Sequence, residues 1–195
     1  MISANATTQT STAFSESHVL IVGTSLNPGS KSWIMANAAG DQLRARGVAV
    51  EVLTLRDLKL PFAGEPEGDR AADVAKLKAA FKRATHIILA VPIYNGEVNA
   101  PARNLVNLGC DFRDKTVGFL CAAGGERCYL GVYPLANSLM LEFECWIVPR
   151  HVYATGNDFS GDAVSNPDIL KRIDALLNAL LSRQPARALE LQAVA

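Results

Sequence analysis

Five short apolar segments, separated by stretches with helical spacing, place the strongest constraint on how this chain can fold. The apolar segments are residues 18–23, 48–55, 86–92, 116–124 and 145–150. Apart from the second, they are nearly continuously apolar rather than alternating, which is typical of strands buried on both faces of a sheet. Helical spacing is found over residues 32–47, 73–84, 97–108, 128–143 and 166–183. This alternation predicts a parallel sheet covered on both faces by right-handed crossovers.

Five strands in this rhythm fit an α/β, flavodoxin-like three-layer sandwich whose parallel sheet has the order 2-1-3-4-5. In such a sheet the ligand lies beyond the carboxyl ends of the strands, where the winding reverses. The loops at that point follow strands one, three and four, and they read "GTSLNPGSKS", "PIYNGEVN" and "AAGGERC". These are also the three stretches richest in glycine and small polar residues, so position and composition predict the same site.

Length and composition predict a single domain. A chain of 195 residues, 49% of them hydrophobic, can bury one substantial core. We expect a disordered N-terminal tail at 1–17, the flavodoxin-like domain at 18–184, and a C-terminal tail at 185–195. The first tail has neither the basic and apolar regions of a secretory signal nor the arginines of a transit peptide, so we expect a cytoplasmic protein. No apolar run approaches 18 residues, and no membrane span is predicted.

Charge and cysteine usage exclude several other classes. Lys and Arg together number 19, as do Asp and Glu, and this zero formal charge predicts no nucleic-acid partner. The chain has four cysteines and three histidines, namely Cys110, Cys121, Cys128, Cys145, His18, His86 and His151. The cysteines show no CxxC spacing and are expected to be buried and reduced. The histidines are far apart, which favours positions at strand edges over metal ligation.

The first loop does not have the spacing of a nucleoside triphosphate loop. Such a loop has lysine directly after its second glycine, whereas here Ser30 stands between Gly29 and Lys31. No G-x-G-x-x-G dinucleotide turn is present either. A strand, a turn and a helix start rich in hydroxyl and amide side chains suit one phosphate monoester. These side chains belong to Thr24, Ser25, Asn27, Ser30 and Ser32. An ordinary serine-capped helix explains this loop equally well on its own.

The second and third loops add two backbone-lined walls. Residues 94–96 stand between a strand end and a helix expected to carry Glu97 in its first turn. Gly96 allows a flat ligand to approach the backbone closely, because glycine has no Cβ. Gly124 and Gly125 serve the same purpose in the third loop. Tyr94 alone would more often be a packing residue, so the prediction depends on all three loops together.

At these residues the chain resembles the NAD(P)H-dependent FMN reductase family, flavodoxin-like enzymes that include quinone, azo-dye and chromate reductases. The resemblance runs from about Val19 to about Thr155 and is carried by "SLNPGS" and by "PIYNG" with Arg103-Asn104 after it. It implies that FMN is the cofactor, with NADPH or NADH as co-substrate. The phosphate would be held by Ser25, Asn27, Ser30 and Ser32. One side of the isoalloxazine would be lined by Pro92, Ile93, Tyr94, Asn95 and Gly96, and its other edge by Ala123, Gly124 and Gly125.

The resemblance also implies an activity. A hydride would pass from NAD(P)H to FMN, and the electrons then to a small-molecule acceptor such as a quinone, an azo compound, free flavin or a metal oxyanion. The flavin performs this chemistry, so no metal and no protein nucleophile is required. The backbone of Asn95 and Gly96 would lie near flavin N5. Family members commonly form homodimers or homotetramers, and the loop 56–69, with Leu60, Pro61 and Phe62, is either such a contact or a plain surface loop.

Two residues depart from the family pattern. Asn27 stands where arginine is usual, which removes a fixed cation from the phosphate site. Ile93 stands where many members have glutamate. Two alternative functions remain open: a flavodoxin-like electron carrier, against which the zero net charge argues, and a non-catalytic flavin-binding module.

Overall fold

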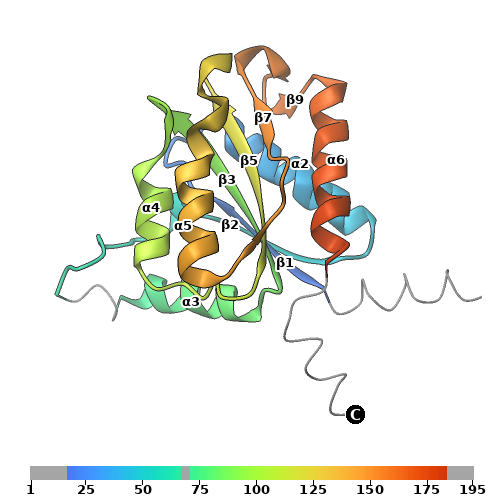
Figure 1. Cartoon of the computed structure of the whole chain (residues 1–195). Coiled ribbons are helices and arrows are strands. Elements are labelled where there is room, and N and C mark those ends of the chain that lie inside the picture. Colours follow the sequence, from blue (N-terminus) through green and yellow to red (C-terminus); the bar gives the residue numbers. More distant parts are fainter. Residues whose placement is uncertain (1–16, 67–70, 184–195) are drawn as a thin grey trace, which may run out of the picture.

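The computed structural model describes residues 17–66 and 71–183, which form a three-layer α/β/α sandwich (Figure 1). The sheet runs in the order β2-β1-β3-β5-β6. These strands are β2 (Ala49–Thr54), β1 (His18–Gly23), β3 (His86–Tyr94), β5 (Thr116–Ala123) and β6 (Trp146–Ile147). The order confirms the predicted 2-1-3-4-5 arrangement. Apart from Ser17, the predicted tails lie outside the described residues.

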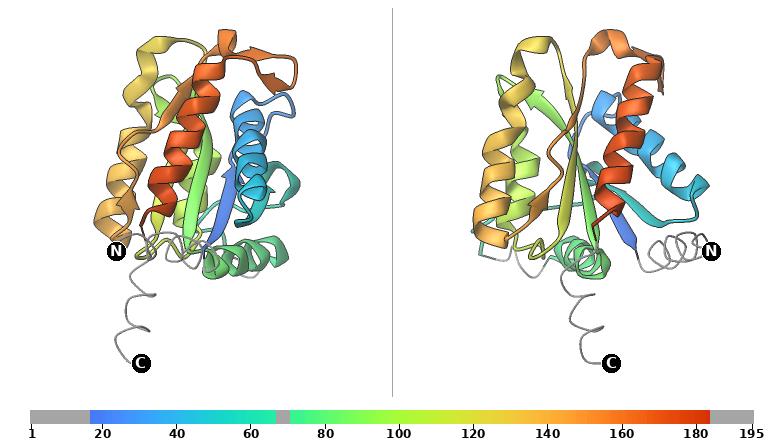
Figure 2. Two further views of the ribbon diagram at one scale, coloured as in Figure 1. Left: turned by 90° about the vertical axis from the view of Figure 1, so that its right-hand side faces the viewer. Right: turned by 45° about the vertical axis from the view of Figure 1, so that its right-hand side comes forward.

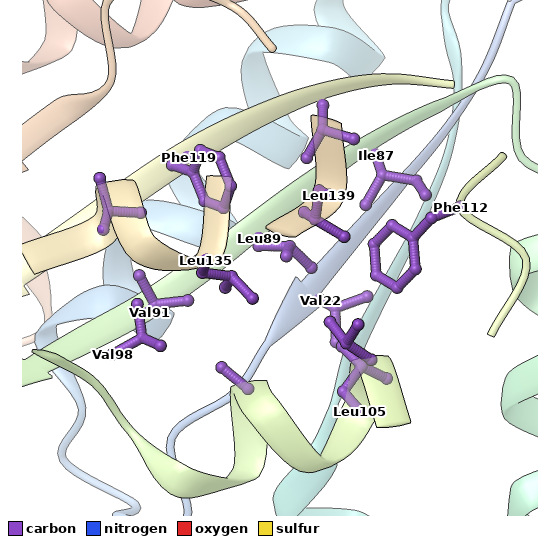
Figure 3. Packing of buried hydrophobic residues seen from close by; sticks show 14 of the residues in the cluster. Val22, Ile87, Leu89, Val91, Val98, Leu105, Phe112, Phe119, Leu135 and Leu139 are labelled. Atoms are coloured by element: carbon purple, nitrogen blue, oxygen red, sulfur yellow. The ribbon is translucent and has the colours of Figure 1, made fainter. Parts of the chain in front are cut away.

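Five α-helices among the described residues cover the two faces of the sheet (Figure 2). The helices are α2 (Lys31–Ala45), α3 (Ala72–Arg83), α4 (Ala100–Asn107), α5 (Tyr133–Phe143) and α6 (Pro167–Leu181). Strand β3 is buried on both sides, as its continuous apolar sequence predicts. Ile87, Leu89 and Val91 pack with residues of α4 and α5 (Figure 3), and α3 contributes to the same cluster. Ile88 and Ala90 face the opposite way, toward α2 and α6.

The register of the parallel strands brings the three predicted loops to one edge of the sheet. Gly23, the last residue of β1, is paired with Thr54 of β2 and with Ala90 of β3. Ile93 is paired with Ala123 at the end of β5. The chain therefore leaves β1, β3 and β5 at the same edge, where Figure 1 shows their loops side by side.

The fifth strand is not continuous, contrary to the prediction of one strand over 145–150. After β6 the chain bulges and then pairs with β5 again as β7 (Val152–Ala154). Five positions separate Ile147 from Val152 (152 − 147), whereas their partners on β5 are three apart (120 − 117). Pro149 lies in this bulge, as expected for a residue that has no N–H to donate to a strand ladder.

The second loop also differs from the prediction, because Glu97 is in a strand and not in the first turn of a helix. Strand β4 (Glu97–Val98) turns back and pairs antiparallel with the end of β3. The turn is made by Asn95 and Gly96, which have φ angles of 53° and 84°. Two positive φ angles define a two-residue type I′ hairpin turn, for which Asn-Gly is the preferred sequence. Gly96 is therefore required by the turn itself.

Several short elements were not predicted. The first part of the expected helix 128–143 is a 3₁₀ segment, η3 (Glu126–Val132). The other short elements are η1 (Leu55–Asp57), η4 (Gly156–Asp158), β8 (Phe159–Ser160) and β9 (Ala163–Val164). The histidines do lie near strand ends: His18 begins β1, His86 begins β3, and His151 immediately precedes β7.

A buried pair of polar side chains joins the loop after β1 to the segment that follows β4. The Asn99 side chain donates from Nδ2 to the Thr24 carbonyl over 2.7 Å. The Thr24 hydroxyl lies 2.8 Å from Asn99 Oδ1 and 3.2 Å from the Ala90 carbonyl, so it can donate to either. Both residues are buried. Because buried polar groups are costly when unpaired, these contacts fix the two loops relative to each other.

We predict that Asn99→Ala lowers the free energy of unfolding by about 1–3 kcal/mol, because the Thr24 carbonyl then loses its buried donor. Asn107→Ala is the matched control, since Asn107 is exposed at the end of α4. Urea denaturation of the two apoproteins measures the difference. Equal stability of the two variants would contradict a structural role for this pair.

Candidate functional site

The first loop holds its polar side chains mainly against its own backbone. Ser25 is buried and its hydroxyl accepts from the Asn27 amide over 3.2 Å. Asn27 is exposed, and its Oδ1 accepts from the Gly29 amide over 3.0 Å. These local bonds give the loop a defined shape, with the Asn27 side-chain NH₂ at the surface.

The helix that follows this loop begins with a serine cap. Ser30 is the N-cap of α2, and its hydroxyl accepts from the Trp33 amide over 3.4 Å. It also lies 2.9 Å from the hydroxyl of buried Ser32. The capping interpretation is thus realised. It does not exclude a ligand, because the first amides of α2 have no carbonyl one turn earlier in the helix and remain able to bind an anion.

The second loop exposes Tyr94 and its turn but buries the two residues before them. The Tyr94 side chain is 56% exposed, whereas Pro92 and Ile93 are buried at the end of β3. Ile93 packs in the core with α4 and α5, so its side chain does not lie at a rim of the site. Asn95 is exposed as well. This loop therefore presents an aromatic side chain and turn backbone.

The third loop presents a glycine pair that the fold itself does not require. A Cβ added at Gly124 or Gly125 would have no other heavy atom within 4 Å, and neither residue has a positive φ. The hydroxyl of Tyr153, on β7, donates to the Gly125 carbonyl. Ala123 before them is buried at the end of β5. The open space around the pair is what close approach of a ligand to the backbone needs.

Segment η3, which follows the third loop, packs against the second loop. A Cβ at Gly131 would lie only 2.6 Å from the Gly96 carbonyl oxygen and 2.8 Å from Ile93 Cγ2. Glycine at this position thus lets η3 pack directly on the Tyr94–Glu97 hairpin. The edge of the sheet therefore combines a helix N-terminus, which suits an anion, with accessible backbone, an arrangement that fits a ligand with one phosphate and one flat ring system.

An aromatic cluster beside the third loop was missed by sequence reasoning. The ring centroids of Tyr129 and His151 are 4.3 Å apart, and those of Tyr129 and Tyr153 are 5.5 Å apart. Burial lowers the pKa of His151, which favours the neutral imidazole. A cavity of about 740 Å³ lies beside this cluster, between the bulge and α6. None of the predicted site residues lines it. The aromatic residues come together only because the broken fifth strand returns to β5.

Three of the four cysteines are buried thiols. Cys110, Cys121 and Cys145 are buried and free, and Cys128 is only partly buried, so the expected burial holds for three of the four. Burial raises the pKa of Cys110 and of Cys145 to about 12. Within residues 17–66 and 71–183, no cluster of His, Cys, Asp or Glu could hold a metal ion. No helix in this part of the chain is long and apolar enough to cross a bilayer.

Comparison with solved structures identifies the fold of related flavoproteins. FerB from Paracoccus denitrificans, a flavoenzyme NAD(P)H:(acceptor) oxidoreductase, superposes with a TM-score of 0.70 at 16% identity, covering 87% of this chain and 99% of that one. The apo form of the NADH:FMN oxidoreductase EmoB superposes with a TM-score of 0.68 at 16% identity, covering 84% of this chain and 90% of that one. A flavodoxin from the domain Archaea superposes with a TM-score of 0.55 at 15% identity, covering 83% of this chain and 98% of that one. At these identities the likeness establishes the fold alone.

The sequence itself gives the family. No curated protein sequence matches this chain. The model of the family described as NADPH-dependent FMN reductase matches residues 17–160, which is well over half of the 195 residues and includes all three loops. The chain therefore belongs to the NADPH-dependent FMN reductase family.

Proposed function

We propose that this protein is an NAD(P)H-dependent FMN reductase that passes electrons to a small acceptor of the quinone, azo, free-flavin or metal-oxyanion class. Family membership supports the general activity. The observation that carries the proposal is the convergence of the three loops after β1, β3 and β5 at one edge of the sheet. One loop suits a phosphate, and the other two leave backbone accessible to a flat ring.

In this proposal the loop after β1 binds the FMN phosphate. The hydroxyls of Ser25, Ser30 and Ser32 and the Asn27 side-chain NH₂ supply donors, together with the first amides of α2. Ser30 and Ser32 lie close enough to share a hydrogen bond, so one of the two hydroxyls keeps its proton free for a phosphate oxygen. The positive end of the α2 dipole adds attraction for the anion.

The ring would lie between the other two loops. Residues 92–96 line one side, Pro92 and Ile93 through backbone and Tyr94 through its exposed ring. Ala123, Gly124 and Gly125 lie at the other edge, where the glycine pair permits contact with the main chain. Bound FMN would supply the chemistry of hydride acceptance and electron transfer. The protein positions it, with the amides of Asn95 and Gly96 as the donors nearest to flavin N5.

We also propose that the protein is a homodimer or homotetramer and that the 56–69 loop, of which the structure describes residues 56–66, contributes to the contact. Phe62 is 69% exposed, whereas Leu60 packs against the core. The loop around Phe62 is held by Asn104, which donates to the Pro61 carbonyl and accepts from the Ala63 amide, both over 2.8 Å. An exposed aromatic side chain on a backbone held in this way is suited to an interface between subunits.

We predict that the purified protein is yellow and that NADPH under argon bleaches the visible flavin absorption, which a small quinone then restores. This cycle distinguishes a reductase from an electron carrier, because a carrier has no site for nicotinamide and is not reduced directly. Dithionite is the control that shows the flavin is reducible. Bleaching by dithionite but not by NADPH or NADH would favour the carrier.

We predict that Ser30→Ala weakens FMN binding by about tenfold to a hundredfold, because a hydrogen bond to a charged acceptor contributes roughly 1.5–3 kcal/mol. Loss of the cap alone would cost about 1 kcal/mol of stability. Exposed Ser160 provides the matched Ser160→Ala control. Fluorescence titration of apoprotein with FMN measures the affinity. A lower apoprotein melting temperature with unchanged FMN affinity would mean that Ser30 only caps α2.

A further inference from the structure

Arg56 lies against the first loop, although it comes from a different part of the chain. Its Nη1 donates to the Asn27 carbonyl over 3.4 Å. The side chain is 28% exposed, so it is partly covered while still reaching solvent. A guanidinium on this loop matters because residues 24–30 contain no lysine or arginine.

Strand pairing explains why Arg56 is there. Thr54, the last residue of β2, is paired with Gly23, the last residue of β1. Segment η1 begins directly after Thr54, whose hydroxyl accepts from the Arg56 amide over 3.3 Å. The backbone of Arg56 is thus fixed next to the start of the first loop, and the side chain needs only its own length to reach Asn27.

Arg56 retains donors for an anion. Its ion pair within the described residues is with Asp57, at 3.6 Å between Nε and Oδ1, and the Asp57 side chain is 70% exposed. Such exposed pairs are weak. A guanidinium has five N–H donors arranged as a planar fork, of which the Asn27 carbonyl engages one. The remaining donors match the oxygens of a phosphate.

Lys31, the other cation near this loop, is directed elsewhere. Its Nζ lies 5.8 Å from the centroid of the Phe159 ring. It also lies 3.0 Å from where a Cβ of Gly156 would be, beside η4. The lysine therefore lies against η4 and the first residue of β8.

We propose that Arg56 binds the phosphate of FMN and supplies, from η1 just after β2, a cation that residues 24–30 lack. This inference rests on the proposed function and adds a binding residue from outside the three loops. Arg56 carries a full charge, whereas residues 25–32 offer hydroxyl, amide and main-chain donors and one lysine that faces another segment. It would make binding selective for FMN over riboflavin, which has no phosphate.

The test compares FMN with riboflavin in fluorescence titrations of the full-length apoprotein. Arg56→Ala is expected to weaken FMN binding by about tenfold to a hundredfold at low ionic strength, with a smaller loss at high salt. Riboflavin affinity should stay unchanged, which also shows that the variant is folded. Lys31→Ala should weaken FMN binding less than Arg56→Ala does. Arg44→Ala, an exposed arginine in the last turn of α2, is the matched control.

A second arm uses rescue. In the Arg56→Ala background, Asn27→Arg places a guanidinium on the same loop and should restore much of the preference for FMN. The proposal would be overturned if Arg56→Ala lost affinity for FMN and riboflavin equally, or lost affinity for neither. If the wild-type protein prefers FMN and Arg56→Ala keeps that preference, only the role of Arg56 is wrong. If the wild-type protein binds riboflavin as tightly as FMN, the proposed phosphate loop is wrong as well.

Discussion

Burial of the central strands on both faces is the constraint on which the rest of this structure depends. Strands β1, β3 and β5 are apolar on both sides and are covered by α2 and α6 on one face and by α3, α4 and α5 on the other. Parallel strands buried in this way must all end at the same edge. The polar loops that follow them therefore meet there, although they are distant in sequence: Thr24 and Asn99, which are hydrogen-bonded, are 75 residues apart.

The same constraint explains why the edge can hold a defined shape. Each loop is tied to a neighbouring element: Thr24 to Asn99, Gly96 to η3 through the close approach at Gly131, and Gly125 to Tyr153. The main-chain atoms that would face a ligand are thus held mainly by contacts on the side away from the ligand. Binding to a preformed site of this kind loses little conformational entropy.

The sequence was sufficient to predict the sheet order and the three loops, because continuous apolar runs identify buried strands and parallel topology then places their ends. The sequence was less informative where local sequence signals compete with contacts between residues that are distant in the chain. Asn95-Gly96 carried a hairpin signal, yet the helical spacing around Ala100 led to Glu97 being assigned to a helix. Pro149 marked the break in the fifth strand, but nothing local showed that the chain would return to β5. The position of Arg56 depends on β2 lying beside β1, so no local pattern could have revealed it.

We propose that the three loops together form the flavin site. Backbone amide NMR spectra of ¹⁵N-labelled apoprotein, recorded during titration with FMN, test it most directly. If these loops form the site, the largest shifts fall on the amides of residues 25–27, 29–32, 94–96 and 124–125, since Pro28 has no amide proton. The amides of Arg172 and Ala175, which line the cavity beside α6, should change little. Large shifts at that cavity with none in the three loops would show that FMN binds beside α6 and not at these loops.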